Sequence, residues 1–403
     1  MSSSLRVLFI APYVPSPIRV RSFQLVRQLV ALGHRVTVVA LEDNRDGVDD
    51  GLGELEQLCE AVHVVSHPAW RGAAQALGAL FTPTPLWAAY CYSPALARVL
   101  RERIDVSSFD VAHVEHLRAA HFATALGPLP RVLDAVDCIT ALQRQMMARS
   151  ESLKGRVLAW EEWSKLRRFE PRAYRPYDRI AVTSEFDAAE LSLLSHELPP
   201  LSVIPNGVDL EYFRPTNTES EKDVLVFSGK MSYRANEDAA LFLAREIFPK
   251  VLARRPKARL YIVGSNPSPS IQALAAENIT VTGYVEDLRP YLSRAAVAVC
   301  PMRIGVGIQN KALEAMAMAR PVVCSPIAAR ALVGAEKTGA VRVAEDAQGI
   351  ADECVALLER PDAAREAGLA ARRYVEARHR WQGAAERFVG LYQGALTERA
   401  KAA

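Results

Sequence analysis

The sequence lacks the patterns that mark several common classes of protein. Its six cysteines lie far apart without a Cys-x-x-Cys pair, which argues against a zinc site or a disulfide framework and favours buried thiols. No apolar run is long enough to span a membrane, and neither an Asp-x-Asp pair nor a Gly-x-Gly-x-x-Gly motif after the first strand is present. The net charge of +3 is too small to indicate a nucleic-acid partner.

The amino-terminal residues do not resemble a secretory signal. The polar leader MSSS is followed by a strand that ends at Pro12, which is too short for the apolar core of a signal peptide. We therefore expect a cytoplasmic protein. A chain of 403 residues, 50% hydrophobic and 24% charged, is expected to form two domains of ordinary size.

Short β-rich runs alternate with helical stretches along the whole chain. Strands at residues 6–11 and 34–41 flank an amphipathic helix at 23–32, and further β-rich runs follow at 111–114, 131–134, 179–183 and 201–204. After residue 205 the pattern restarts, with runs at 224–228, 259–263, 279–282, 297–300 and 322–324. This predicts an α/β fold with two doubly wound parallel sheets, whose strand ends would place ligands in a shared cleft.

The most informative stretch is residues 301–321, PMRIGVGIQNKALEAMAMARP. A buried strand leads through Gly305-Val306-Gly307 into a helix rich in strong helix formers. Glycines let the backbone approach a ligand, and the amides of the helix's first turn point at an anion. Glu314 follows one turn into the helix, where it could accept hydrogen bonds from a sugar or ribose hydroxyl.

Polar side chains surround these glycines. Arg303, Gln309, Asn310 and Lys311 would make a poor core and a plausible cradle for a diphosphate. The alternative is a turn that only packs strand against helix.

Several of these segments together resemble a known family. Ser228-Gly229, Gly264, Thr282-Gly283-Tyr284-Val285, the stretch 305–319 and Pro205-Asn206-Gly207-Val208-Asp209 look like the retaining glycosyltransferases of family four, which have the GT-B architecture. The string GIQNKALEAMAM is most similar to sugar transferases of bacterial exopolysaccharide systems. The resemblance covers residues 5–395 and is specific in the second half and loose in the first. It implies two Rossmann-like domains that face an interdomain cleft.

The resemblance assigns roles to the two domains. Residues 1–204 would form the acceptor-side domain, with a tail helix at 383–403 packing back on it, and residues 205–382 would bind the nucleotide sugar. In the second domain Glu314 would hold the ribose hydroxyls, and Tyr284 and Val285 would lie in the base-binding loop. The remaining donor-binding positions would be Gly229, Arg303, Gly307, Ile308, Gln309, Asn310 and Lys311.

Catalysis would depend on cations near the diphosphate. The family often has a basic pair after the Ser-Gly turn, and Lys230 and Arg234 are the candidates, with Arg303 as a third. Many members also carry a glutamate that contacts the donor sugar, where this chain has Val306. Either backbone amides and amide side chains would then hold the sugar, or the donor specificity would differ from that of members with the glutamate.

The first domain would supply groups for the acceptor and the reacting sugar. Arg19 and Arg21 could reach the phosphate or the acceptor. His116 lies beyond a strand end, in the region where related enzymes keep a histidine near the reacting sugar. Asp137 could orient the acceptor hydroxyl or accept its proton, whereas Asp134 is interpreted as a strand-terminal cap.

Two segments could form interaction surfaces. Residues 144–179 contain ten basic and five acidic residues with interleaved aromatics, which favours either contact with an anionic lipid or membrane, or a long solvated helix packed by its aromatics. Residues 81–92, FTPTPLWAAYCY, form a second apolar candidate for acceptor or membrane contact.

The sequence therefore predicts a retaining hexosyltransferase for polysaccharide biosynthesis that needs no metal or other cofactor. Its partners would be a nucleotide-sugar donor, with UDP favoured because it is common in the family, and a glycan, lipid-linked or small-molecule acceptor. Two alternatives stay open. A sugar-nucleotide epimerase would have the same fold, and Val306 would also suit a non-catalytic subunit that only binds nucleotide sugars.

Overall fold

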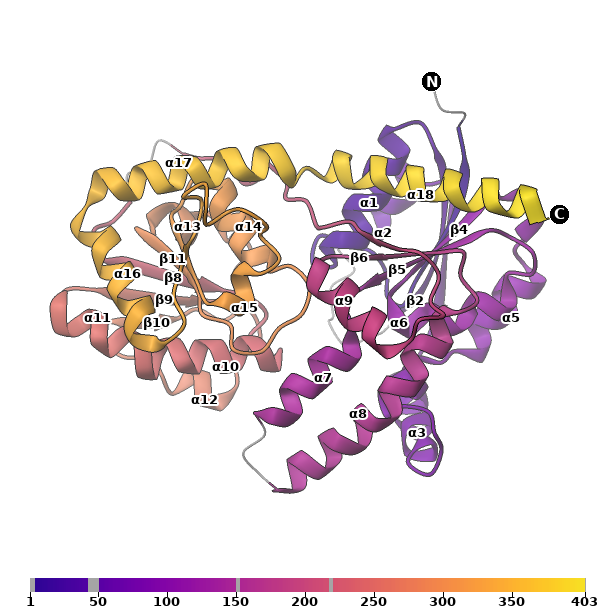
Figure 1. The fold of residues 1–403 in the computed structure, drawn as a ribbon, viewed down its shortest axis with the longest axis horizontal. Helices are drawn as coiled ribbons and strands as arrows, with labels where there is room; N and C mark the ends of the chain where they lie inside the picture. The colour runs from indigo at the N-terminus through magenta and orange to yellow at the C-terminus, as the bar shows by residue number, and fades with distance from the viewer. Residues whose placement is uncertain (1–3, 43–50, 150–152, 217–219, 403) are drawn as a thin grey trace. The chain divides into compact units, whose positions relative to one another are not determined.

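The computed structural model describes residues 4–42, 51–149, 153–216 and 220–402, which form two compact units (Figure 1). Unit 1 consists of Met1–Pro205 and Trp381–Ala403, and unit 2 of Asn206–Arg380. The first three residues of the polar leader and residues 150–152 of the basic segment lie outside the described residues.

Unit 1 is built on a seven-stranded parallel sheet with the order β3-β2-β1-β4-β5-β6-β7. The strands are β1 (Arg6–Ala11), β2 (Arg35–Glu42), β3 (Ala61–Ser66), β4 (Val111–Glu115), β5 (Arg131–Val136), β6 (Arg179–Val182) and β7 (Leu201–Val203). The central strands are buried along almost their whole length, as expected for a parallel sheet covered on both faces. The order reverses between β1 and β4, so the loops after these two strands flank the position where doubly wound folds bind ligands.

The helices of unit 1 include the carboxyl-terminal helix. They are α1 (Val20–Ala31), α2 (Leu52–Leu58), α3 (Ala69–Ala79), α4 (Leu86–Cys91), α5 (Pro94–Glu102), α6 (His116–Ala119), α7 (Ile139–Ala148), α8 (Leu153–Tyr174), α9 (Glu185–Leu194) and α18 (Trp381–Ala402), with 3-10 turns at Val106–Ser108 and Ala120–Ala125. Helix α18 runs beside α1 (Figure 1), and its Trp381, Phe388 and Tyr392 share a core cluster with Phe9. Residues from the far end of the sequence therefore complete the core of unit 1.

An ion pair is buried in the centre of this unit. The guanidinium of Arg21 donates to both carboxylate oxygens of Asp134 at 2.6 and 2.8 Å and to the carbonyl of Ile204 at 3.2 Å. Arg21 is only 6% exposed, and Asp134 is fully buried. The sequence-based interpretations of Arg21 as a phosphate or acceptor ligand and of Asp134 as a strand cap are therefore wrong: the two side chains neutralise each other in the core.

Helix α8 holds the amino-terminal ends of two other helices. The Glu162 carboxylate accepts from the amides of Leu86 and Trp87 at 3.0 and 3.3 Å, at the start of α4. Eight residues later, buried Glu170 accepts from the amides of Ile139 and Thr140 at 3.0 and 2.8 Å, at the start of α7. Each carboxylate satisfies amides that a helix leaves unpaired in its first turn.

Unit 2 has a six-stranded parallel sheet with the order β10-β9-β8-β11-β12-β13. Its strands are β8 (Val224–Ser228), β9 (Arg259–Val263), β10 (Ile279–Val281), β11 (Val297–Cys300), β12 (Val322–Cys324) and β13 (Arg342–Val343). Its helices are α10 (Arg234–Phe242), α11 (Phe248–Arg254), α12 (Pro269–Gln272), α13 (Arg289–Arg294), α14 (Asn310–Ala317), α15 (Pro326–Ala329), α16 (Ala347–Glu359) and α17 (Pro361–Arg378), with a π-turn at Leu243–Ile247. The predicted α/β class with two parallel sheets is confirmed.

Asn236 lies in the first turn of the helix that follows β8. This helix, α10, begins at Arg234. The Asn236 amide donates to the carbonyl of Lys230 at 2.9 Å. Its side chain therefore fixes the turn after β8 and caps no helix.

Candidate functional site

Two glycine turns at the carboxyl ends of β8 and β9 touch each other in unit 2. Gly229 and Gly264 have φ values of +151° and +149°, which disfavour any residue with a side chain. A Cβ atom on Gly264 would lie 1.8 Å from the carbonyl oxygen of Gly229. Only glycine at position 264 allows this close approach, so the backbones of the two loops pack directly against each other.

The glycine-rich loop and α14 lie at the same edge of the sheet. Gly307 has a φ of +60°, and α14 begins three residues later at Asn310. The ammonium of Lys311 donates to the Gln309 side chain at 3.1 Å. The Cε of Lys311 lies 3.2 Å from the point that a Cβ atom would occupy if residue 229 had a side chain. A cation, glycine backbone and the start of a helix therefore surround one small region, as anion binding requires.

Amide side chains next to this helix are held by other residues. The Asn206 amide donates to Asn310 Oδ1 at 2.8 Å, so the Pro205–Asp209 motif reaches the start of α14. Gln309 Nε2 donates to the carbonyl of Val306 at 3.5 Å, while Ile308 and Val306 are buried at 8% and 6% exposure.

Glu314 lies one turn into α14, close to Lys311. Burial raises the pKa of the Glu314 carboxyl to about 7, although the charge of Lys311 acts in the opposite direction. A carboxyl group with this pKa is only partly ionised at neutral pH, and hydrogen bonds donated by a ligand would favour its charged form.

The other candidates in unit 2 have different surroundings. Lys230 and Arg234 are exposed beside the first glycine turn, and Tyr284 is 64% exposed after β10, with Val285 half-buried next to it. Arg303 donates to both carboxylate oxygens of Asp238 at 2.7 and 3.0 Å, and its guanidinium lies 4.3 Å from the ring centroid of Phe242. Its charge is therefore already paired with α10.

In unit 1, His116 has a strained backbone at the end of β4. Its φ of +68° is uncommon for a residue with a side chain and marks a position fixed by its surroundings. The amide of Arg118 donates to His116 Nδ1 at 3.3 Å, which leaves the proton of a neutral ring on Nε2. Burial, Arg118 and Arg19 hold the pKa of His116 well below its ordinary value, so the imidazole is neutral at pH 7.

Asp137 follows a second strained position, at the end of the neighbouring strand β5. Val136 has a φ of +67°, and the pairing register of β5 with β6 shifts between Asp134 and Val136. Burial and the nearby Asp187 raise the pKa of Asp137 to about 7, and the hydroxyl of Thr183 donates to its Oδ1 at 3.1 Å. This carboxyl group could exchange a proton near neutral pH.

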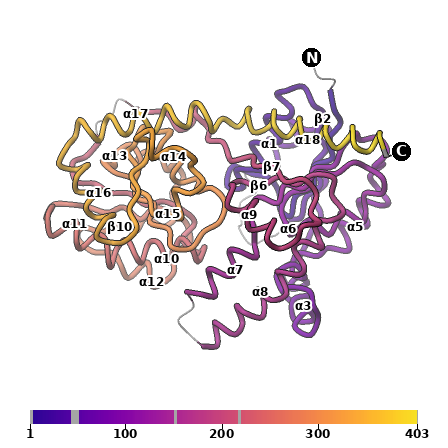
Figure 2. Tube along the Cα trace, in the orientation of Figure 1, coloured from indigo at the N-terminus to yellow at the C-terminus, as the bar shows by residue number. Residues whose placement is uncertain are grey.

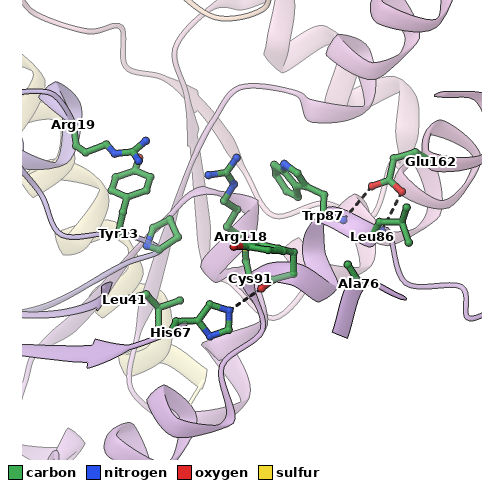
Figure 3. Close-up of a pocket in the computed structure, with 12 residues that line it drawn as sticks. Tyr13, Arg19, Leu41, His67, Ala76, Leu86, Trp87, Cys91, Arg118 and Glu162 are labelled. Atoms are coloured by element: carbon green, nitrogen blue, oxygen red, sulfur yellow. Dashed lines mark hydrogen bonds between the residues drawn. The ribbon is translucent and has the colours of Figure 1, made fainter. Parts of the chain in front are cut away.

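A cavity of about 350 Å³ in unit 1 lies beside His116 (Figure 3). It is lined by Pro12, Tyr13, Arg19, Leu41, His67, Ala76, Leu86, Trp87, Tyr90, Cys91, Arg118 and Glu162. The Trp87 ring lies 5.4 Å from the His116 ring, centroid to centroid, so the cavity adjoins the strained histidine. The sequence indicated only part of this wall, through Arg19 and the apolar segment 81–92. Tyr13 and Arg118 carried no motif.

The structure brings together only some of the candidates within each unit. Gly229, Gly307, Gln309, Asn310, Lys311 and Glu314 gather at one sheet edge of unit 2, and Arg19 and His116 border one cavity in unit 1. Among the described residues no helix is long and apolar enough to cross a membrane. Within the same part of the chain, no three His, Cys, Asp or Glu side chains are grouped as a metal site would require.

Two family models match the chain, one in each half. Residues 19–212 match "Glycosyltransferase Family 4", and residues 222–360 match "Glycosyl transferases group 1". The chain belongs to glycosyltransferase family four. The second match includes the glycine-rich loop and Glu314, and the first includes His116 and Asp137.

The names of similar proteins include different nucleotide sugars. A curated relative from Corynebacterium glutamicum, the GDP-mannose-dependent monoacylated alpha-(1-6)-phosphatidylinositol monomannoside mannosyltransferase, is 24% identical over 337 residues, covering 77% of this chain and 81% of the relative. Sucrose-phosphate synthase from Thermosynechococcus elongatus superposes with a TM-score of 0.69 at 18% identity, covering 98% of this chain and 100% of that one. Anabaena HepE in complex with UDP-glucose superposes with a TM-score of 0.67 at 15% identity, covering 97% and 100%. The predicted GT-B fold is thereby confirmed.

Proposed function

We propose that this glycosyltransferase moves a hexose from a nucleotide diphosphate sugar to an acceptor hydroxyl, with retention of the anomeric configuration and without a metal ion. The observation that carries the proposal is the sheet edge of unit 2, where contacting glycine turns, the start of α14, Lys311 and Glu314 surround one region. Backbone amides suit a diphosphate, and a carboxylate one turn away suits the hydroxyls of a ribose.

Unit 2 binds the donor in this proposal. Glu314 accepts hydrogen bonds from the ribose hydroxyls, and the exposed ring of Tyr284 offers a stacking surface for the base, with Val285 beside it. Gly229 and the segment Gly307-Ile308-Gln309-Asn310 approach the diphosphate and the sugar through their backbone amides, next to the Lys311 ammonium.

Cations stabilise the departing nucleoside diphosphate. As the bond from the sugar C1 to the phosphate oxygen breaks, negative charge grows on the diphosphate, and Lys230 and Arg234 are placed after the glycine turn to offset it. These cations and the helix amides take the place that a divalent ion has in other transferases. Arg303 acts as a positioning residue, because it ties the loop after β11 to α10 through Asp238.

Unit 1 serves the acceptor and the reacting sugar. Asp137 accepts the proton of the acceptor hydroxyl as the new bond from its oxygen to C1 forms, and the raised pKa of Asp137 suits this task at neutral pH. His116, neutral with its proton on Nε2, donates a hydrogen bond to the sugar. Arg19 lines the cavity beside His116.

Product analysis tests the proposal. The purified chain is incubated with UDP-glucose, GDP-mannose and ADP-glucose, each with and without a panel of sugar and lipid-linked acceptors, and NMR determines the anomeric configuration of the product. We expect acceptor-dependent transfer with retention that is unchanged by EDTA. Conversion of the donor to its epimer without acceptor would support the epimerase alternative. Donor binding without turnover on any acceptor would support a binding subunit.

Nucleotide binding should depend on pH through Glu314. The ionised carboxylate accepts the ribose hydrogen bonds, and its pKa of about 7 lies above that of a solvated glutamate, so affinity should rise as pH increases from 6 to 8. Calorimetry with a sugar nucleotide, whose diphosphate diester does not titrate in this range, measures the profile. Glu314→Ala should lose about 1–3 kcal/mol of binding free energy, and Glu314→Gln should bind weakly at every pH. A folded Glu314→Ala variant with native affinity would remove the ribose assignment.

We also propose that unit 1 contacts a membrane surface peripherally. In Figure 2 α3 and α8 lie side by side, in agreement with hydrogen bonds from Lys165 Nζ to the carbonyls of Ala79 and Leu80 at 3.1 and 3.3 Å. Phe81 is 95% exposed after α3, and Leu153 and Leu158 on α8 are 77% and 55% exposed, within the basic segment that the sequence analysis identified.

Vesicle sedimentation tests this contact. Wild-type protein should co-sediment with vesicles containing anionic phospholipid, and Phe81→Ser with Leu158→Glu should weaken the binding about tenfold or more, because both lost apolar area and a new negative charge oppose it. Leu193→Glu is the matched control, since Leu193 is 77% exposed on α9, which lies outside this surface. Equal binding by all three proteins would refute the contact.

A further inference from the structure

We propose that the 350 Å³ cavity of unit 1 is an acceptor subsite for a molecule that carries a phosphate or carboxylate group next to an apolar or aromatic body. The inference rests on the proposed transfer function and names its acceptor class. It depends on three features of the cavity: an apolar wall, two arginines stacked on aromatic rings, and a position beside His116.

The wall of the cavity is largely apolar and has a suitable size for part of a small molecule. Leu41 in β2 and Leu86, Trp87 and Cys91 in α4 supply apolar surface from two places in the sequence. A volume of about 350 Å³ lies within the range of ligand pockets in proteins, roughly 300–1,000 Å³. In Figure 3 the Arg118 side chain stands between Tyr13 and Trp87, so aromatic rings flank a cation in the cavity.

The two arginines are oriented by stacking. The Arg118 guanidinium carbon lies 4.8 Å from the centroid of the Trp87 ring, and that of Arg19 lies 4.4 Å from the centroid of Tyr13. A stacked guanidinium keeps its N–H groups in its own plane, where they can form the paired hydrogen bonds that carboxylates and phosphates accept. Arg118 Nε is buried and has no hydrogen-bond partner among the described residues.

The described carboxyl groups near Arg118 form no ion pair with its guanidinium. Glu162 is directed to the amides of Leu86 and Trp87, and burial raises its pKa. Tyr13 donates to Glu115 at 3.1 Å, and burial and Asp134 raise the pKa of Glu115 to about 8, so this carboxyl group is mostly neutral at pH 7. The cavity therefore presents to a ligand the Arg118 guanidinium, which has no ion-pair partner among the described residues.

The position of the cavity connects it to transfer. Trp87 contacts both Arg118 and His116, and the Arg118 amide donates to the His116 ring. A molecule with its anionic group at Arg118 and its apolar part against Trp87 would lie beside His116, which the proposed function assigns to the reacting sugar. The charged group thus fixes the acceptor at a distance from the hydroxyl that reacts.

Binding of small probes tests the subsite without any donor present. Calorimetry compares phenyl phosphate, the uncharged phenyl β-glucoside and inorganic phosphate. For wild-type protein we expect phenyl phosphate to bind best. Arg118→Ala should weaken phenyl phosphate binding about tenfold or more and leave phenyl β-glucoside unchanged, because only the charged hydrogen bonds are lost. Trp87→Ala should weaken both phenyl ligands, and Arg118→Lys should recover part of the loss.

Arg71→Ala is the matched control, since Arg71 also stacks on a tryptophan, Trp70, at 5.2 Å, but does not line this cavity. Native phenyl phosphate affinity in folded Arg118→Ala would overturn the proposal. Inorganic phosphate binding as tightly as phenyl phosphate would also overturn it, because the apolar wall would then contribute nothing. Transfer activity is scored separately: a protein that binds phenyl phosphate through Arg118 and never transfers sugar would refute the proposed function and leave an anionic ligand site.

Discussion

Asp137→Asn is expected to lower the turnover number by about 100- to 10,000-fold, the range for loss of a general acid or base, while donor affinity stays nearly native. The carboxylate accepts the proton in this proposal, so wild-type turnover at saturating donor should rise with pH through about 7, the pKa of Asp137. Asparagine cannot take the proton, so the residual turnover of the Asp137→Asn variant should not depend on pH in this range. Rapid-quench kinetics with saturating donor and acceptor, measured from pH 5.5 to 8.5, gives both results.

Two further variants make this prediction specific. The Thr183 hydroxyl donates to Asp137 and lowers its pKa, so Thr183→Val should move the turnover profile to higher pH. His116→Ala should also bind the donor and transfer poorly, but its rate should keep the wild-type pH midpoint, since the neutral ring donates a hydrogen bond and takes no proton. A rate for Asp137→Asn within a few-fold of wild type would exclude Asp137 as the proton acceptor.

The second large effect is expected at the cations after the first glycine turn. Lys230→Ala and Arg234→Ala should each lower the chemical rate, and the residue that contacts the leaving diphosphate should cost about 100-fold or more. Donor affinity should fall less, because the charge on the diphosphate grows only as the bond to the sugar breaks. Single-turnover rates and calorimetric affinities for the same variants separate the two quantities.

Controls for this pair come from the same unit. Lys257→Ala removes an exposed cation before β9, at the opposite end of the sheet, and should change neither quantity. Arg303→Ala breaks the ion pair with Asp238 and should reduce thermal stability together with activity. If Lys230→Ala and Arg234→Ala both turn over at the native rate, backbone amides and Lys311 stabilise the leaving group.

The central strands of both sheets could be predicted from the sequence because they are buried on both faces and read as continuous apolar runs. The predicted strands at 6–11, 224–228 and 259–263 coincide with β1, β8 and β9. The edge strands β3 and β13 were missed, since β3 is only half-buried and β13 has two residues. Their pairing depends on neighbours that are distant in the sequence.

The candidate site residues also include some that the sequence could predict and some that it could not. The glycine-rich loop of unit 2 is contiguous, so its residues could be identified from spacing alone. The cavity in unit 1 could not, because Tyr13, Trp87 and Arg118 come from three separate loops and helices, and only the sheet order brings them together. Arg21 shows the converse error: its position suggested a ligand, whereas a carboxylate 113 residues away pairs with it in the core.

Helix α8 fixes the positions of α4 and α7 relative to each other. Glu162 and Glu170 lie on one rigid rod, so the offset between the start of α4 and the start of α7 is set by two turns of a single helix. A shift of α8 along its axis would break the hydrogen bonds at the start of α4 and at the start of α7 together. Trp87 at the cavity and the segment that follows Asp137 would then both move. Changes at the exposed half of α8 would therefore alter the cavity and the surroundings of Asp137 together.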